Sequence, residues 1–178
     1  FVRDNGECCF GPGAALYGIN PLPGQSNPML GVVTLQVRIL QTRRIDAFQT
    51  VGYGGAWRSA RPSRVATIAL GYADGYFRSL VNRTHVHLAG HTVPVIGRIS
   101  MDLVTIDVSD VPEELCQPGM TVEALGPHLT PDDLAEHGRT NAYEVMTALG
   151  RRYHRAYIDS FAGAVPESSG EAPSGDSA

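Results

Sequence analysis

The 178-residue chain contains no lysine, because all 14 of its basic residues are arginine. A lysine amine is the group with which proteins form a Schiff base to a carbonyl compound. The chain therefore cannot make such an adduct through a lysine of its own. Its formal net charge of −4 is small and does not indicate nucleic-acid binding as a bulk property.

Cysteines are few, and long apolar runs are absent. The three cysteines, Cys8, Cys9 and Cys116, have no metal-binding spacing, which predicts reduced structural thiols in a cytosolic protein. No run approaches the roughly 20 apolar residues of a membrane-spanning helix, and no signal peptide is evident. Because the chain begins with Phe1 rather than Met, we expect it to be part of a longer protein.

The length predicts one folded domain with irregular flanks. Residues 1–29 contain no periodic pattern and are predicted to be a lead-in and linker. Residues 30–159 carry the periodic segments and form the predicted domain. Residues 160–178 are rich in glycine, proline, serine and acids, which predicts a disordered tail.

Alternating apolar and polar residues predict a mainly β fold. Residues 33–39 alternate with a period of two, as in a half-buried strand. Residues 66–70 form an apolar run, and residues 85–88 and 92–96 read as a hairpin. Pro94 lacks an N–H group, so its strand is predicted to lie at a sheet edge or to carry a bulge.

Further strands are predicted later in the chain. Residues 99–108 are expected to form a long strand with Met101 and Asp102 on opposite faces. Two shorter strands are expected over residues 120–125 and 151–159.

Two short helices interrupt these strands. Thr130 followed by Pro131 predicts the capped start of one helix. Asn141 and Glu144 have the spacing of a capping box, and that helix is predicted to end at Gly150. Many short strands with two brief helices predict a small Greek-key barrel or a sandwich-like domain.

Three short segments combine glycine with tyrosine, arginine or aspartate, and we expect them to converge: residues 51–55, 71–75 and 97–102. In the second segment, two glycines predict a sharp turn by adopting positive φ. Such a turn leaves Tyr72 and Asp74 on a rim where they can face a ligand.

Tyr53 lies between glycines and is predicted to project from a turn. A phenol that acts as a base near neutrality needs cationic neighbours or hydrogen bonds that favour the phenolate. Such cations could come from Arg58, Arg61, Arg64, Arg78 and Arg98. The alternative is a tyrosine of the core or of an ordinary turn.

Other candidate residues also have plain alternatives. Met101 alone is more typical of a core residue than of a binding site. His85 and His87 share a strand face near His91, but no carboxylate has matching spacing, so we predict surface histidines and no metal. Tyr143 lies in the first turn of a predicted helix, where a hydroxyl can help to bind a phosphate.

An ordered set of motifs resembles the C-terminal β domain of alanine racemase over about residues 12–158. The motifs are residues 12–18 (PGAALYG), 51–55 (VGYGG), 71–75 (GYADG), 94–102 (PVIGRISMD) and 143–144 (YE). Each motif is weak alone, but their order and spacing match the family.

The resemblance implies an isomerase that interconverts L- and D-alanine with pyridoxal 5′-phosphate. It implies a (β/α)8-barrel domain before this chain, the end of which would fall within residues 1–29. That domain would supply the cofactor lysine, so the isolated chain is expected to be inactive. The family is a cytoplasmic, head-to-tail homodimer with shared active sites, and it supplies D-alanine for bacterial peptidoglycan.

The resemblance also assigns roles to individual residues. Tyr53 is implied to be the catalytic base on the L-alanine face, and Tyr72 to be a gate of the substrate corridor. Met101 is implied to contact the substrate carboxylate through its backbone. The corridor is implied to be lined by Arg78, Arg98 and Asp102, and the cofactor phosphate to be bound by Gly13, Ala14 and Tyr143.

Two positions depart from the family pattern. Gly11 replaces an arginine that binds the ring nitrogen of the cofactor, and Asn141 replaces an apolar residue near the corridor. Two alternatives therefore stay open: a racemase of broader substrate range, and a non-catalytic binding or oligomerisation module.

Overall fold

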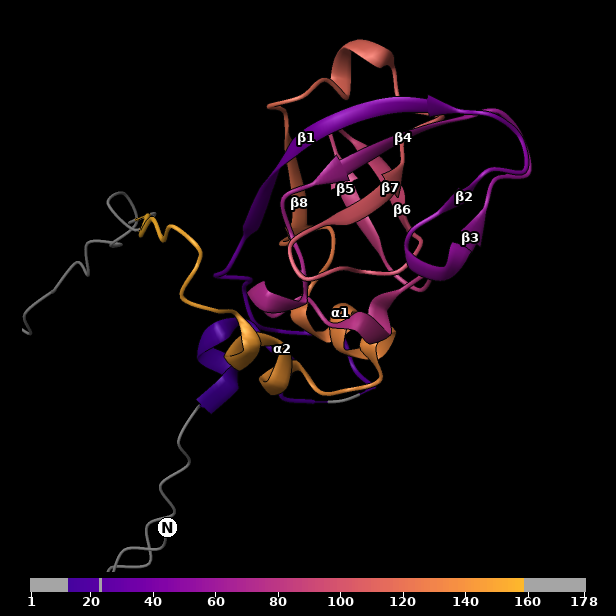
Figure 1. Cartoon of the computed structure of the whole chain (residues 1–178). Coiled ribbons are helices and arrows are strands. Elements are labelled where there is room, and N and C mark those ends of the chain that lie inside the picture. The colour runs from indigo at the N-terminus through magenta and orange to yellow at the C-terminus, as the bar shows by residue number, and fades with distance from the viewer. Residues whose placement is uncertain (1–12, 23, 159–178) are drawn as a thin grey trace, which may run out of the picture.

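The computed structural model describes residues 13–22 and 24–158, so predictions for residues 1–11, including Gly11, and for the tail at 160–178 fall outside it. Six antiparallel strands close into a barrel in the order β1-β4-β7-β6-β5-β8 (Figure 1). The strands are β1 (Leu35–Ile45), β4 (Ser63–Ile68), β5 (His85–Leu88), β6 (His91–Ile96), β7 (Val104–Asp107) and β8 (Thr121–Leu125). The prediction of a mainly β Greek-key domain is confirmed, and the choice between barrel and sandwich falls on the barrel.

The Greek-key topology follows from the pairing. Strands β5, β6 and β7 are consecutive neighbours, and β8 returns by a longer connection to pair with β5. The spatial order 8-5-6-7 is that of a Greek key. Closure leaves the six strands without a free edge, which removes the usual site of unwanted strand pairing.

Strand β1 closes the barrel by pairing with two neighbours. Its first part, from Leu35 to Arg38, pairs with β8, and its second part, from Ile39 to Ile45, pairs with β4. The register shifts between Ile39 and Gln41, as in a β-bulge. This irregularity turns the strand from one neighbour to the other.

The core fills the barrel with aliphatic side chains from every strand. Ile39, Ile68, Val86 and Ile106 are at most 1% exposed. Burial of this kind is the main stabilising term in folding.

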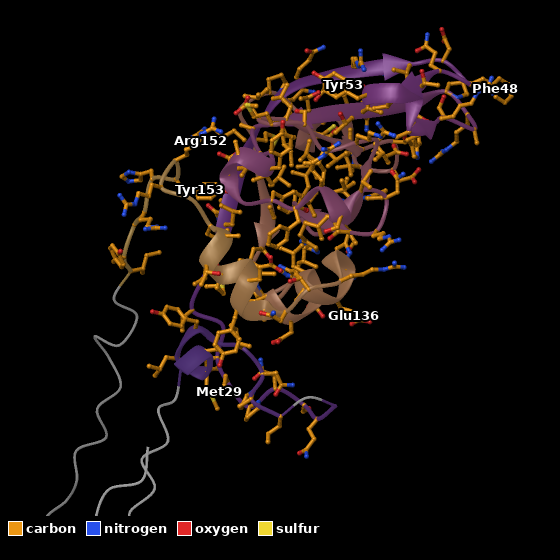
Figure 2. All side chains as sticks on the ribbon, turned by 60° about the horizontal axis from the view of Figure 1, so that its bottom comes forward. Met29, Phe48, Tyr53, Glu136, Arg152 and Tyr153 are labelled. Atoms are coloured by element: carbon orange, nitrogen blue, oxygen red, sulfur yellow. The ribbon has the colours of Figure 1, made fainter. Side chains whose placement is uncertain are left out.

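A smaller cluster lies outside this core and supports a two-stranded ribbon. The ribbon is formed by β2 (Thr50–Val51) and β3 (Trp57–Arg58), and it projects from the barrel (Figure 1). Val51 and Trp57 pack there against Ile45, Val65 and Ile96. Phe48 lies at the tip of the projection (Figure 2).

Both predicted helices form, below the barrel in Figure 1: α1 (Pro131–Gly138) and α2 (Ala142–Ala148). Thr130 and Asp133 make a full capping box at the start of α1. At α2 the Asn141 side chain accepts from the Glu144 N–H, whereas the Glu144 carboxylate bonds to Thr140. In the described part of the chain, no helix is long and apolar enough to cross a membrane.

Three sequence predictions are wrong. The strand expected over residues 99–108 is limited to β7, because the Ser100 N–H bonds to the Leu103 carbonyl and closes a turn. Residues 151–158 form no strand, since the closed barrel offers no edge for pairing. Pro94 lies in an interior strand, but β6 pairs with β7 only at Val95 and Ile96, so its missing N–H costs no bond there.

Histidines gather on the outer wall formed by β5, β6 and β8. The rings of His87 and His128 stack at 3.9 Å, and His128 Nδ1 lies 3.1 Å from Glu123 Oε1. Within residues 13–22 and 24–158, no group of three or more histidine, cysteine or acidic side chains is placed to hold a metal ion. Burial lowers the pKa of His87, and His128, His85 and His91 lower it further, while Glu123 opposes them.

This stack predicts a pH dependence of stability. Because the folded state holds the His87 pKa below its usual 6.5, the unfolded chain binds more protons near that pH. Stability should therefore fall as pH drops through 6.5 and flatten only below the folded pKa. In urea titrations from pH 7.5 to 5.5, His87→Gln should lose less stability than the parent chain. Exposed His154→Gln is the control, and equal pH slopes in both variants would contradict this interpretation.

Candidate active-site cleft

Three glycine-containing turns meet, as the sequence predicts. They follow β2, β4 and β6 in the chain. A Cβ atom added to Gly52 would lie 2.7 Å from the Arg98 nitrogen, and one added to Gly97 would lie 2.9 Å from the Val51 oxygen. The first and third turns are therefore in contact through their backbones, with no room for a side chain between them.

The turn after β4 joins this group through Gly71. The Tyr72 N–H donates to the Ser100 carbonyl, and the Ala73 N–H donates to the Met101 carbonyl, both at 3.0 Å. A Cβ atom on Gly71 would lie 2.1 Å from that Met101 oxygen. The expected reason for this glycine is wrong: Gly71 is extended at φ −160°, and only Gly75 adopts positive φ. Close approach, rather than backbone conformation, requires glycine at 71.

A cleft opens where these turns converge, and five predicted site residues line it: Tyr53, Tyr72, Arg78, Arg98 and Met101. Ile99 and Ser100 complete the lining. Tyr53 belongs to a short 3-10 helix, η2 (Tyr53–Gly55), and its side chain is 72% exposed. The prediction that Tyr53 projects from a turn is confirmed by this exposure.

The lining carries two guanidinium groups and no carboxylate. Arg98 passes over the Tyr53 turn, because a Cβ atom on Gly54 would lie 3.5 Å from its Nη1. Arg78 lies over the Tyr72 ring, with its Cζ 5.7 Å from the ring centroid, in a cation–π arrangement. This combination of phenols and cations suits a small anionic group such as a carboxylate.

Two aspartates lie beside the cleft rather than in its lining. Asp74, expected on the rim, is 7% exposed, and its Oδ2 accepts from the Gly71 N–H at 2.9 Å. Asp102, predicted to line the corridor, accepts a 2.7 Å hydrogen bond from Arg152. The Arg152 Nε also lies 3.3 Å from Asp74 Oδ1.

The three predicted phosphate-binding residues are in a separate region. Gly13 and Ala14 begin a 3-10 helix, η1 (Gly13–Tyr17), and Tyr143 lies in the first turn of α2. A Cβ atom on Gly13 would lie 3.5 Å from the Tyr143 hydroxyl oxygen, so a side chain there would fill the space beside it. Ala14 is buried in the core, which leaves only its backbone for a ligand.

Sequence reasoning missed Arg152. It lies fifty positions beyond Asp102, in a segment predicted as a strand. No motif or spacing links these residues, so only the folded chain reveals the ion pairs. The sequence places Asp74 in the turn, but only the structure shows that it is buried and caps the Gly71 N–H.

The comparisons with known proteins agree with this picture. The family model for the alanine racemase C-terminal domain matches residues 32–157. The chain is 52% identical over 160 residues to the alanine racemase of Rhodospirillum rubrum, covering 90% of this chain and 41% of that protein. It is 48% identical over 147 residues to the catabolic alanine racemase of Agrobacterium fabrum, covering 83% and 38%.

Solved structures agree as well. An alanine racemase from Bartonella henselae with covalently bound pyridoxal phosphate shares 41% identity and a TM-score of 0.77, covering 82% of this chain and 40% of that one. The biosynthetic enzyme from Pseudomonas aeruginosa gives 34% identity and a TM-score of 0.78, with 83% and 41% covered.

The closed six-stranded barrel with its two helices thus has the fold of the C-terminal β domain of alanine racemases. The chain belongs to the alanine racemase C-terminal domain family. It spans about two fifths of the length of the relatives that it matches.

The contact at Gly71 predicts a large effect of one methyl group. Gly71→Ala should destabilise the chain by about 3 kcal/mol, the upper end of the usual cost of overpacking, because the new Cβ collides with backbone. The free energy of unfolding in urea measures this. Gly31→Ala is the matched control: a Cβ there meets nothing within 4 Å, so the change should stay within about 0.5 kcal/mol. Equal stability of the two variants would show that the turns are not in backbone contact.

Proposed function

We propose that this chain is the C-terminal domain of a pyridoxal 5′-phosphate-dependent alanine racemase that interconverts L- and D-alanine. The observation that carries the proposal is the cleft itself, where three separate turns bring together Tyr53, Tyr72, Arg78, Arg98 and Met101. Family membership and the names of the relatives support it. These names favour alanine over the broader substrate range and over a non-catalytic module.

Inversion at the α-carbon of an amino acid needs two proton-transfer groups on opposite faces. We propose Tyr53 as the group on the L-alanine face, with its hydroxyl oxygen taking the α-proton. Its exposure leaves the hydroxyl free to reach a substrate, and the Arg98 guanidinium lies beside the turn that carries it. A lysine from the preceding domain serves the D-alanine face.

The remaining lining residues bind and orient the substrate. The guanidiniums of Arg78 and Arg98 attract a carboxylate, and the Met101 backbone borders the site where it would rest. We propose Tyr72, which also lines the cleft, as the gate of the corridor. Asp102 lies behind the lining, where it accepts a hydrogen bond from Arg152, and its proposed role is to support the lining from there.

The residues at the second region fit a phosphate group. A Cβ atom on residue 13 would be in van der Waals contact with the Tyr143 hydroxyl, so glycine at this position leaves the space beside it open. We propose that the backbone of Gly13 and Ala14 and the hydroxyl of Tyr143 hold the cofactor phosphate. When bound, pyridoxal phosphate supplies an electron sink that stabilises negative charge at the α-carbon.

Because this chain contains no lysine, the proposed active site needs residues from a second domain. A (β/α)8-barrel domain preceding this chain supplies the cofactor lysine. In a head-to-tail homodimer, Tyr53 of one subunit reaches the cofactor held by the other subunit. The product D-alanine serves peptidoglycan synthesis in the bacterial cytoplasm.

The base role of Tyr53 predicts an asymmetric defect. In a hybrid enzyme, residues 13–158 replace the matching part of the Rhodospirillum rubrum racemase. Tyr53→Phe should slow α-proton exchange from L-alanine by about 10²–10⁴-fold and affect D-alanine far less. Exchange of each enantiomer in D₂O, followed by NMR, measures this.

Tyr157→Phe is the control for that experiment, because this tyrosine is 92% exposed and distant in sequence from the three turns. Equal, small losses for both enantiomers would remove Tyr53 from the base role. An inactive hybrid with the unmodified chain would instead favour the non-catalytic module.

Because the 178-residue chain has no lysine, it should not form a covalent adduct with pyridoxal phosphate that borohydride can trap. After incubation with pyridoxal phosphate and borohydride, mass spectrometry should find no stoichiometric adduct other than at the N-terminal amine. The hybrid enzyme, treated in parallel, should carry one adduct per subunit. A stoichiometric adduct elsewhere on this chain would refute the proposal that a second domain supplies the lysine.

A further inference from the structure

Arg152 connects two elements that the proposed chemistry needs but that lie far apart in the sequence. Its Nη2 donates to Asp102 Oδ1 at 2.7 Å, and its Nε lies 3.3 Å from Asp74 Oδ1. Asp74 belongs to the turn that presents Tyr72, and Asp102 directly follows Met101. One guanidinium therefore joins both turns that form this side of the cleft.

The backbone of the segment before Arg152 packs directly against the turn that contains Asp74. The Gly150 N–H donates to the Asp74 carbonyl at 3.2 Å. A Cβ atom on Gly75 would lie 1.9 Å from the Ala148 oxygen, so the end of α2 rests directly on this turn. These backbone contacts place Arg152 next to the aspartates independently of its own side-chain bonds. Figure 2 shows Arg152 beside Tyr153.

The ion pairs also affect the charge of the cleft. Asp74 is buried, so its carboxylate needs a partner, and it has both the Gly71 N–H and Arg152. Asp102 is bound on the Arg152 side, and the lining retains Arg78 and Arg98 without a carboxylate. The hydrogen bond to Asp102 and the charge of Asp74 raise the pKa of Arg152, so it stays charged.

We propose that Arg152 is a positioning residue for the cleft: it holds Asp74 and Asp102 together, fixes the turns that present Tyr72 and Met101, and keeps the Asp102 carboxylate out of the lining. The effect on substrate rests on the proposed racemase function. The effect on the turns does not. Tyr53 is held by Gly97 and Arg98 instead, so Arg152 should influence substrate binding more than proton transfer.

The chain offers a direct readout of the turns. It has four methionines, so its ¹³C-methyl NMR spectrum contains four methionine signals, assigned through Met→Leu variants. In the full 178-residue chain, Arg152→Gln should shift the Met101 signal and leave those of Met29 and Met120 in place. Arg152→Lys keeps the charge but not the two-point geometry, and should give a smaller shift.

Arg151→Gln is the matched control, because Arg151 is the adjacent exposed arginine and makes no side-chain bond within the described residues. Asp102→Asn provides a second route to the same loss. It should shift Met101 in the same direction, and the double variant should add little to either single variant. An unchanged Met101 signal in Arg152→Gln would overturn the proposal, as would equal shifts of all four signals.

The hybrid enzyme tests the functional part. Arg152→Gln should raise the KM for L-alanine by about twofold to fivefold, the range expected for a partly exposed ion pair, with kcat unchanged. Arg151→Gln should change neither. A fall in kcat at constant KM would contradict the positioning role. If the unmodified hybrid is inactive, the proposed function fails, and the NMR result alone decides whether Arg152 holds the turns.

Discussion

Closure of the barrel by one long strand is the constraint on which the rest of the structure depends. The irregularity after Ile39 lets β1 pair with β8 at one end and with β4 at the other. Without it, the sheet would have two free edges and its strand ends would not return to each other. Strands β4, β7 and β6 are neighbours in this sheet, so the connections after β4 and β6 lie at adjacent strand ends, where the connection after β2 also makes backbone contact. The cleft therefore lies where these connections meet, and Ile99 alone among its lining residues also belongs to the barrel core.

Contacts between turns are made by backbone atoms, and this explains the glycines of the family motifs. Gly52, Gly71 and Gly97 each face a neighbouring main chain at less than 3 Å from where a Cβ would lie. At the Gly71 turn, the Tyr72 and Ala73 N–H groups donate to the Ser100 and Met101 carbonyls across the gap. Tyr53, Tyr72 and Met101 are exposed beside these contacts and form part of the lining.

Local patterns in the sequence predicted much of this fold. The period of two over residues 33–39, the hairpin over residues 85–96 and the cap at Thr130 all depend on nearest neighbours, and all are present. The second half of β1 escaped prediction because its bulge breaks the alternation of buried residues. Residues 99–103 looked like a strand by composition, but contacts with the distant Gly71 turn bend them.

Those residues of the candidate site that lie in recognisable sequence motifs could be predicted. Five predicted residues meet in the cleft, and Gly13 meets Tyr143. Arg152 could not be found, because its partners are separated from it by 50 and 78 positions and only tertiary structure joins them.

The glycine contacts divide the site into two kinds of position with different tolerance to change. Gly52, Gly71 and Gly97 leave no room for a side chain. Lining positions such as Tyr72 and Met101 are at least 41% exposed and do not belong to the core. Residues at these exposed positions can therefore be substituted, and substrate preference can change, without altering the backbone contacts between the turns. A library that randomises Tyr72 and Met101, and leaves Tyr53 and the glycines unchanged, would vary the lining on a fixed scaffold.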